Sequence, residues 1–211
     1  MNSNKNIWKS ILRIFAVTIF LSPLPLLSDG PWKVKKNSKG IMVETRTADG
    51  YEAEEFRATT TIDTPFEIAV EIMKEVPKFK LWMPRLLEVK VVQDQAPHSK
   101  IIYMAIDMPW PVKDRDMYVQ MTDKLDLAKG IYERNNVGIE GYPAVSQRIR
   151  FKKVSFLWVL KRNEADKSKT DVLYTSKGDP AGKLPAWIIN LGNVDIPHEF
   201  LFNLKYKYRK K

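Results

Sequence analysis

The chain has 211 residues, of which 44% are hydrophobic and 28% charged, and its formal net charge is +10. This length suffices for one domain with a sizeable core, and the ordinary globular balance excludes a disordered chain and a polytopic membrane protein. The sequence has no cysteine, which excludes disulfides, thiolate catalysis and cysteine-ligated metal sites.

The first 28 residues form a segment of their own. Lys5, Lys9 and Arg13 precede the apolar run 14–21, and no acidic residue occurs before position 29. A basic stretch followed by a short apolar run is typical of a secretory signal, whereas a bilayer-spanning helix needs about 20 apolar residues. We therefore expect a signal peptide or N-terminal anchor over residues 1–28, and an exported protein that is periplasmic or membrane-associated. The alternative is an N-terminal helix of a cytoplasmic protein.

Strand patterns begin the remaining part of the chain, residues 29–211, which we treat as one domain. A hairpin is expected over 32–46, with its turn at 37–40, because turn-forming residues separate two short runs. Thr-rich alternation then predicts a strand over 51–62.

A short amphipathic helix is expected after this strand. Apolar residues at helical spacing predict it over 65–76, where Pro65 suits the first turn and either Asp63 or Thr64 could cap it. A short helix or loop follows over 79–87.

The second half of the chain has more strands and ends in a long helix. Short turn-rich connections favour antiparallel pairing between neighbouring strands. Helical spacing of apolar residues predicts the final helix over 184–208. The strands are expected over 87–93, 100–108, 116–125, 130–136, 146–160 and 170–177.

This order of elements indicates an α+β fold. A curved antiparallel sheet wrapped around the long C-terminal helix is the simplest way to bury the apolar faces of both. Such a helix-grip arrangement leaves a space between the helix and the sheet. That space is either filled by side chains or forms an internal hydrophobic cavity for a ligand.

Several motifs along the chain resemble those of START domains (steroidogenic acute regulatory protein-related lipid transfer), here of the bacterial type, within the helix-grip superfamily. The resemblance implies a deep cavity that binds a sterol, phospholipid, ceramide or other apolar molecule in a carrier or sensor. The matching features, in chain order, are Trp32 with 40–43, the helix 66–76, Trp82, the segment 111–116 (PVKDRD), the strand end 174–180, and the helix start 184–190 (LPAWIIN).

One departure from the family concerns charge inside the cavity. Some animal members place an acidic residue and an arginine there, and an ungapped alignment from Arg115 puts Ile102 and Met121 at those positions. This weakens any transfer of sterol specificity and predicts an unusually apolar cavity.

The candidate cavity residues come from the central strands, the loop before the second of them, and the C-terminal helix. Methionines cluster on these strands, and a flexible thioether adapts to an irregular apolar ligand, although ordinary core is the alternative. Arg115 could contact a head group or hold its own loop; Trp110 could cover the cavity mouth, enter a membrane interface or pack in its loop. The candidates are Tyr103, Met104, Trp110, Arg115, Met121, Tyr174, Trp187, Leu191 and His198.

Two features of the C-terminal segment suggest movement and membrane contact. Gly192 and Pro197 interrupt the helix, so the segment either hinges to admit a ligand or only bends to fit the sheet. The basic tail could dock transiently on anionic lipid head groups, or simply complement the helix dipole. The tail residues are Lys205, Lys207, Arg209, Lys210 and Lys211.

The function expected from these patterns is non-catalytic binding of a lipid or other apolar molecule by a carrier or sensor. We expect a monomer with no cofactor, no metal and no nucleic-acid partner, since the sequence has neither metal-ligand spacing nor a nucleic-acid recognition motif. The alternatives are a structural domain with a filled cavity and an enzyme. A cyclase- or hydrolase-like enzyme of the same superfamily would draw its acid–base groups from Tyr103, Tyr174, Arg115, Asp107 or His198.

Overall fold

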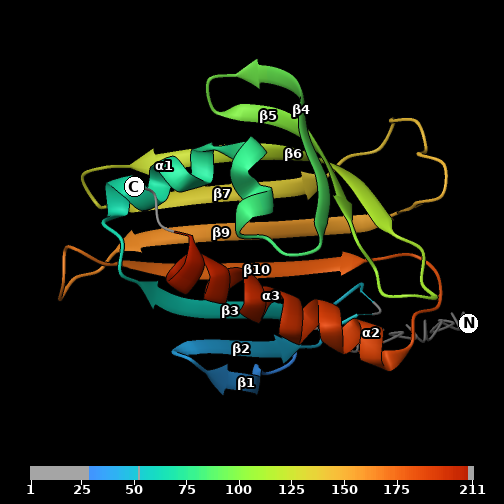
Figure 1. The fold of residues 1–211 in the computed structure, drawn as a ribbon, viewed down its shortest axis with the longest axis horizontal. Helices are drawn as coiled ribbons and strands as arrows, with labels where there is room; N and C mark the ends of the chain where they lie inside the picture. Colours follow the sequence, from blue (N-terminus) through green and yellow to red (C-terminus); the bar gives the residue numbers. More distant parts are fainter. Residues whose placement is uncertain (1–28, 52, 209–211) are drawn as a thin grey trace, which may run out of the picture.

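A curved antiparallel sheet forms the body of the structure, a computed structural model that describes residues 29–51 and 53–208 (Figure 1). Its strands are β1 (Lys33–Ser38), β2 (Ile41–Arg46), β3 (Glu55–Ile62), β4 (Leu86–Ala96), β5 (Ser99–Ile106), β6 (Arg115–Asp126), β7 (Ile131–Gly138), β8 (Ile149–Arg150), β9 (Lys153–Arg162) and β10 (Thr170–Asp179). The spatial order is β1-β2-β3-β10-β9-β7-β6-β5-β4, and the short β8 pairs in parallel with β6. All other pairs are antiparallel, as the short connections predict.

Two helical segments pack on one face of this sheet. The helix α1 (Phe66–Lys74) contacts β9 and continues into the 3₁₀ turn η1 (Val76–Leu81). The C-terminal helix lies across β2 and β3, and Figure 1 shows it running along the sheet beside β10. It is continuous from residue 186 to residue 207 and consists of α2 (Ala186–Asn190), η2 (Leu191–Asp195), α3 (Ile196–Phe202) and η3 (Asn203–Lys207). The expected sheet wrapped around a long C-terminal helix is thus confirmed.

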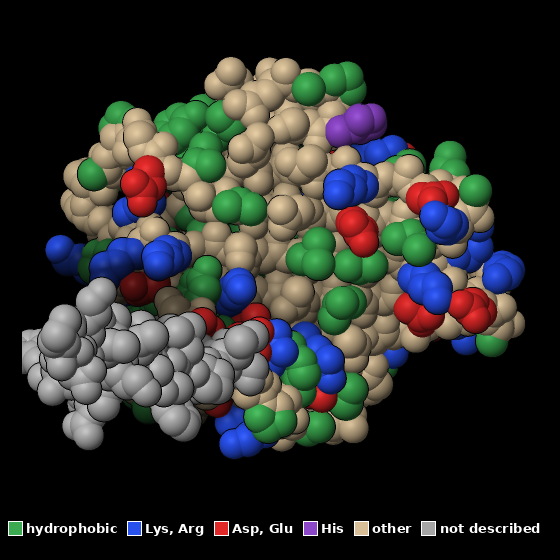
Figure 2. Space-filling model, turned by 180° about the vertical axis from the view of Figure 1, so that it is seen from behind, with side chains coloured by type: hydrophobic (Ala, Val, Ile, Leu, Met, Phe, Trp, Pro, Cys, Tyr) green, Lys and Arg blue, Asp and Glu red, His purple; other side chains and the backbone are tan. Residues whose placement is uncertain are grey.

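The core lies between the helices and the inner face of the sheet. Trp158 on β9 stacks on Tyr174 on β10, with 4.0 Å between ring centroids, and meets Trp82 edge-on at 5.5 Å. Aromatic pairs of this kind add about 0.5–1.5 kcal/mol beyond the burial of their area. Figure 2 shows the opposite face of the molecule, where basic and acidic side chains are interspersed with hydrophobic ones. The sheet therefore has one buried and one solvent-facing side.

The expected strand over 146–160 is wrong, because the chain changes partners within it. Antiparallel pairing of β7 with β6 starts at Val119 and Gly138, so the start of β6 lacks this neighbour. The short β8 fills the gap on the β6 side, and β9 begins only at Lys153. The N–H of Phe151 donates to the carbonyl of Asp116 between these two strands.

The ends of the helices also differ from expectation. The first helix starts at Phe66 with Pro65 in the cap position, and no side chain caps it, so the expected caps Asp63 and Thr64 are wrong. The C-terminal helix contains two π-helical segments, the first of which, η2, directly precedes Pro197. A proline has no N–H to donate, which accounts for the altered hydrogen bonding in the turn before it.

Part of what the sequence suggests lies outside the described residues. This holds for the expected signal or anchor, 1–28, and for the basic residues 209–211 of the tail. Within residues 29–51 and 53–208, no helix is long and apolar enough to cross a membrane.

Candidate ligand-binding pocket

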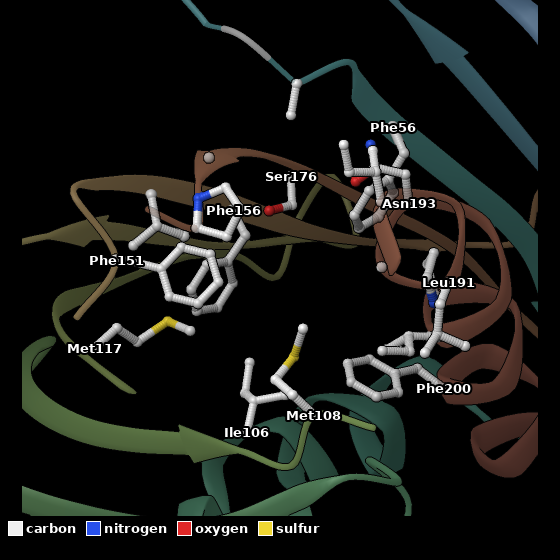
Figure 3. A pocket seen from close by; sticks show the side chains of 18 of the residues that line it. Phe56, Ile106, Met108, Met117, Phe151, Phe156, Ser176, Leu191, Asn193 and Phe200 are labelled. Carbon is white, nitrogen blue, oxygen red and sulfur yellow. The ribbon is translucent and has the colours of Figure 1, made fainter. Parts of the chain in front are cut away.

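An apolar pocket lies between the C-terminal helix and the inner face of the sheet (Figure 3). Its walls come from β3, β5, β6, β9 and β10, from the loop after η1, and from the helix on the opposite side. Figure 3 shows Met117, Phe151 and Phe156 on one side, with Leu191 and Phe200 facing them from the helix. Every residue that lines the pocket is uncharged. The surroundings therefore suit an apolar occupant and would penalise a buried charge.

Methionines and aromatic rings dominate the pocket wall. The methionines are Met83, Met104, Met108 and Met117, and the aromatic residues are Phe56, Phe151, Phe156, Tyr174 and Phe200. Unbranched thioether side chains can change rotamer with little cost, whereas the rings give the wall fixed surfaces. This combination lets a pocket adapt its shape to a flexible chain.

The pocket is small in this state of the protein. Its volume is about 160 Å³, and since a water molecule needs roughly 10–15 Å³ of such space, it would hold on the order of ten to fifteen non-hydrogen atoms. Sites for drug-sized ligands are typically about 300–1,000 Å³. A complete phospholipid therefore requires the helix or its flanking loops to move outward.

Three polar side chains interrupt the apolar lining. Tyr174 and Ser176 both project from β10, and Asn193 comes from η2 on the facing helix. Asn193 Nδ2 donates to the carbonyl of Glu54 at 3.0 Å, which fixes its side chain. Burial raises the pKa of the Tyr174 phenol above its ordinary value, so the group remains protonated at neutral pH.

Met104, Tyr174 and Leu191 are the candidates from the sequence that line this pocket. Met121 also faces the inner side of the sheet, but it is buried in the core beyond the pocket. Tyr103 points to the other face, where its hydroxyl is bonded to Asp116 at 3.3 Å and to Arg148 at 2.6 Å. Strand alternation explains this difference, since Tyr103 and Met104 are neighbours on β5.

Arg115 lies beneath the connection between β10 and the C-terminal helix. Its guanidinium donates to the carbonyl oxygens of Pro180 and Ala181, each at 3.1 Å, and to that of Lys113. The side chain is only 2% exposed, and burial lowers its pKa. Arg115 thus holds its own loop through the carbonyl of Lys113, which is the structural alternative, and also holds the start of the connection that follows β10.

Two tryptophans flank the pocket from outside. Trp110 is 90% exposed in the β5–β6 connection, two residues beyond Met108, which lines the pocket. Trp187 is half exposed at the start of α2, one residue before the lining residue Ile188. Both indole rings are therefore accessible to contact by another surface.

His198 lies on the far side of α3 from the pocket lining. Its Nε2 is 2.9 Å from the Ser38 hydroxyl and 3.2 Å from the Ser38 carbonyl oxygen. Burial lowers the pKa of His198, and this favours the neutral ring. The residue fastens the C-terminal helix to the β1–β2 hairpin and does not line the pocket.

The sequence reasoning missed two kinds of pocket residue. Ser176 could have been found, because it lies two positions after Tyr174 and therefore on the same face of the strand. Phe151 could not, since its position depends on the change of partners between β8 and β9. Among the residues that the structure describes, no group of three His, Asp or Glu side chains could hold a metal ion.

Solved structures of similar fold occur among known proteins. No protein-family model matches the chain. An uncharacterized protein of Pseudomonas aeruginosa is 26% identical over 181 residues, which cover 85% of this chain and 88% of that protein. A STAR-related lipid transfer protein from Xanthomonas axonopodis shares 23% identity with a TM-score of 0.72, covering 82% of this chain and 96% of that one. Human StAR-related lipid transfer protein 5 shares 15% identity with a TM-score of 0.74, covering 82% and 84% respectively. The chain therefore has the START-type helix-grip fold that its sequence motifs resemble.

Proposed function

We propose that the protein binds a lipid or another apolar molecule in the pocket between the C-terminal helix and the sheet, and carries or senses it without catalysis. The observation that supports this proposal is a lining made entirely of uncharged residues. Each methylene removed from water gains about 0.8 kcal/mol, so a ten-carbon chain gains about 8 kcal/mol before the costs of association.

Entry of the ligand requires the C-terminal helix to loosen over the pocket. The π-helical segment η2 lies at this point, and Gly192, Ile196 and Pro197 line the pocket from it and from the next turn. The N–H of Ile196 donates to the carbonyl of Leu191 across a π turn. Irregular turns of this kind mark functional positions in helices, and Pro197 weakens the hydrogen bonding further. We propose that the helix opens here.

Exchange with a membrane fits the surroundings of the pocket. The exposed indoles of Trp110 and Trp187 flank it, and tryptophan favours the interface between lipid head groups and acyl chains. Lys113 lies in the same β5–β6 connection as Trp110, and Lys183 lies in the connection just before α2, which carries Trp187. Both would contact anionic head groups. The expected export of the protein would place this surface beside an envelope membrane, and a monomer would suffice for the transfer.

An enzyme acting on an apolar substrate is the second candidate, and the pocket offers little chemistry for it. Tyr174 is the one titratable side chain among the lining residues, and its raised pKa keeps it from acting as a base near neutral pH. The other groups that the enzyme hypothesis offers, Tyr103, Arg115, Asp107 and His198, do not line the pocket.

Native mass spectrometry of the protein purified without detergent tests the proposal, with lipid analysis of the denatured sample. A co-purified apolar molecule at near-stoichiometric amount, or uptake from liposomes, is the expected result. A bare protein mass in both experiments would remove the carrier and sensor functions.

A further inference from the structure

The hydroxyl of Tyr174 has no hydrogen-bond partner among the described residues, although the side chain is only 8% exposed. Its ring is held on three sides, by Trp158 at 4.0 Å, Phe56 at 5.1 Å and Phe200 at 6.0 Å between centroids. The phenol is therefore fixed in place while its polar end lies in the pocket lining. This hydroxyl is not among the fully buried unpaired atoms, so solvent or a ligand in the pocket can reach it. A polar atom of a ligand can therefore use its free hydrogen-bonding capacity.

Ser176 provides a second hydroxyl on the same strand. Two residues apart on β10, Tyr174 and Ser176 project from the same face of the strand. Figure 3 shows Ser176 between Phe156 and Asn193, within the same pocket. The Ser176 hydroxyl also has no hydrogen-bond partner among residues 29–51 and 53–208. Two donor–acceptor groups thus line a pocket wall that is apolar apart from them and Asn193.

The lining contains no charged residue to balance an ionised ligand group. The buried Arg115, which contacts the lining residue Pro180, already donates to three backbone carbonyls. A carboxylate or phosphate inside the pocket would lose its hydration without gaining a counter-charge, which is far more costly than burying a hydroxyl. A neutral polar group can instead bond to these hydroxyls, since each can donate and accept.

We infer that the pocket selects an uncharged apolar ligand that carries a hydroxyl or carbonyl oxygen, and that Tyr174 and Ser176 bind this oxygen. The inference rests on the proposed function and adds the chemical class of the ligand. An alkyl chain with a terminal alcohol is the simplest member of the class, and its length is limited by the pocket volume to on the order of ten carbons in the closed state. Longer members require the helix to open.

Competition binding tests the inference with ligands of matched size. A neutral fluorescent probe, N-phenyl-1-naphthylamine, is bound to the full-length protein and displaced by decan-1-ol, by undecane or by decanoate at pH 8. We expect decan-1-ol to compete roughly 3- to 10-fold better than undecane, the size of effect that one to two neutral hydrogen bonds give. Decanoate should compete least among the three.

Three variants then assign the preference to its residues. Tyr174→Phe and Ser176→Ala should each weaken decan-1-ol binding and leave undecane binding unchanged, and the double variant should bind both ligands equally. Tyr132→Phe is the matched control, because that hydroxyl is also buried and unpaired but does not line the pocket. Unchanged undecane binding shows in each case that the pocket is intact, so a folding defect cannot imitate the result.

The outcomes separate the inference from the function on which it rests. If the probe does not bind, or no ligand displaces it from the unmodified protein, the proposed function fails. If undecane and decan-1-ol compete equally, or Tyr174→Phe leaves their ratio unchanged, the pocket is apolar without selecting oxygen, and the inference alone is overturned. Stronger competition by decanoate would overturn it as well, in favour of an anionic ligand.

Discussion

Replacing Gly192 with leucine should stabilise the protein and weaken its ligand binding at the same time. Gly192 lines the pocket in the middle of the C-terminal helix, and a Cβ added there would meet no heavy atom within 4 Å. Replacing a glycine inside a helix raises the free energy of unfolding by about 0.5–1 kcal/mol, and burying a leucine side chain raises it by about 1.5–3 kcal/mol. After the loss of side-chain entropy, we expect a net gain of about 2 kcal/mol.

The cost to binding follows from the pocket volume. A leucine side chain adds four carbon atoms to a pocket of about 160 Å³, which holds on the order of ten to fifteen non-hydrogen atoms. A chain that fills the pocket would then lose the burial of three to four methylenes, or about 2.4–3.2 kcal/mol. Its affinity should therefore decrease roughly 50- to 200-fold.

Thermal unfolding and probe displacement measure the two effects on the same sample. A gain of about 2 kcal/mol should raise Tm by roughly 4–8 °C in a chain of this length. Asn190→Leu is the matched control, because Asn190 is exposed on the same helix and does not line the pocket. If the Gly192→Leu variant is folded and binds decan-1-ol with unchanged affinity, the assignment of the ligand to this pocket is refuted. A lower Tm would refute the claim that the space above Gly192 is free.

Four further substitutions each test the role of a single residue. Arg115→Met should lower the free energy of unfolding by about 2–4 kcal/mol in chemical denaturation, because it leaves three carbonyl oxygens without their donor. Trp110→Ala should change stability by less than about 0.5 kcal/mol yet reduce sedimentation with anionic vesicles, and equal sedimentation would remove the membrane role of this exposed indole. Because burial lowers the pKa of His198, the folded state prefers the neutral ring, and stability should be lost as the pH falls below the ordinary value of 6.5. His198→Gln should flatten this dependence, as seen in Tm measured between pH 5 and pH 8. Pro197→Ala should slow lipid exchange between vesicles, and an unchanged rate would mean that Pro197 only fits the helix to the sheet.

Periodicity predicted the fold because it is a local property of the chain. Helical spacing of apolar residues predicted the C-terminal helix over nearly its full length, and the strand candidates Met104 and Tyr174 line the pocket. Tyr103 and Met121 were assigned to the cavity from the same strands, but alternation puts Tyr103 on the outer face and distance along the strand puts Met121 deeper in the core. A strand pattern shows that neighbouring residues lie on opposite faces, but it gives neither which face of this strand is inward nor how deep a residue lies along it.

Features that depend on contacts between residues far apart in the chain could not be predicted from local patterns. The π-helical turn before Pro197 depends on how the helix meets the sheet, and the position of Phe151 depends on where β7 ends. The unpaired hydroxyls of Tyr174 and Ser176 become visible only when every neighbour is known. An unsatisfied polar group is a property of the whole packed structure, whereas a hydrophobic pattern belongs to one segment.

The adjacent pair Arg115 and Asp116 shows how the two levels combine. Because neighbouring strand residues face opposite sides, Arg115 points inward and binds the connection that leads into the C-terminal helix, while Asp116 points outward. Both carboxylate oxygens of Asp116 bind the guanidinium of Arg150, at 2.7 and 3.0 Å, which fixes β8 beside β6. The next residue after Arg150 is Phe151, which lines the pocket. The two residues therefore hold the pocket on two sides. Arg115 holds the connection to the C-terminal helix, and Asp116 holds the wall that contains Phe151. This accounts for an RD motif at the start of β6 that makes no direct contact with a ligand.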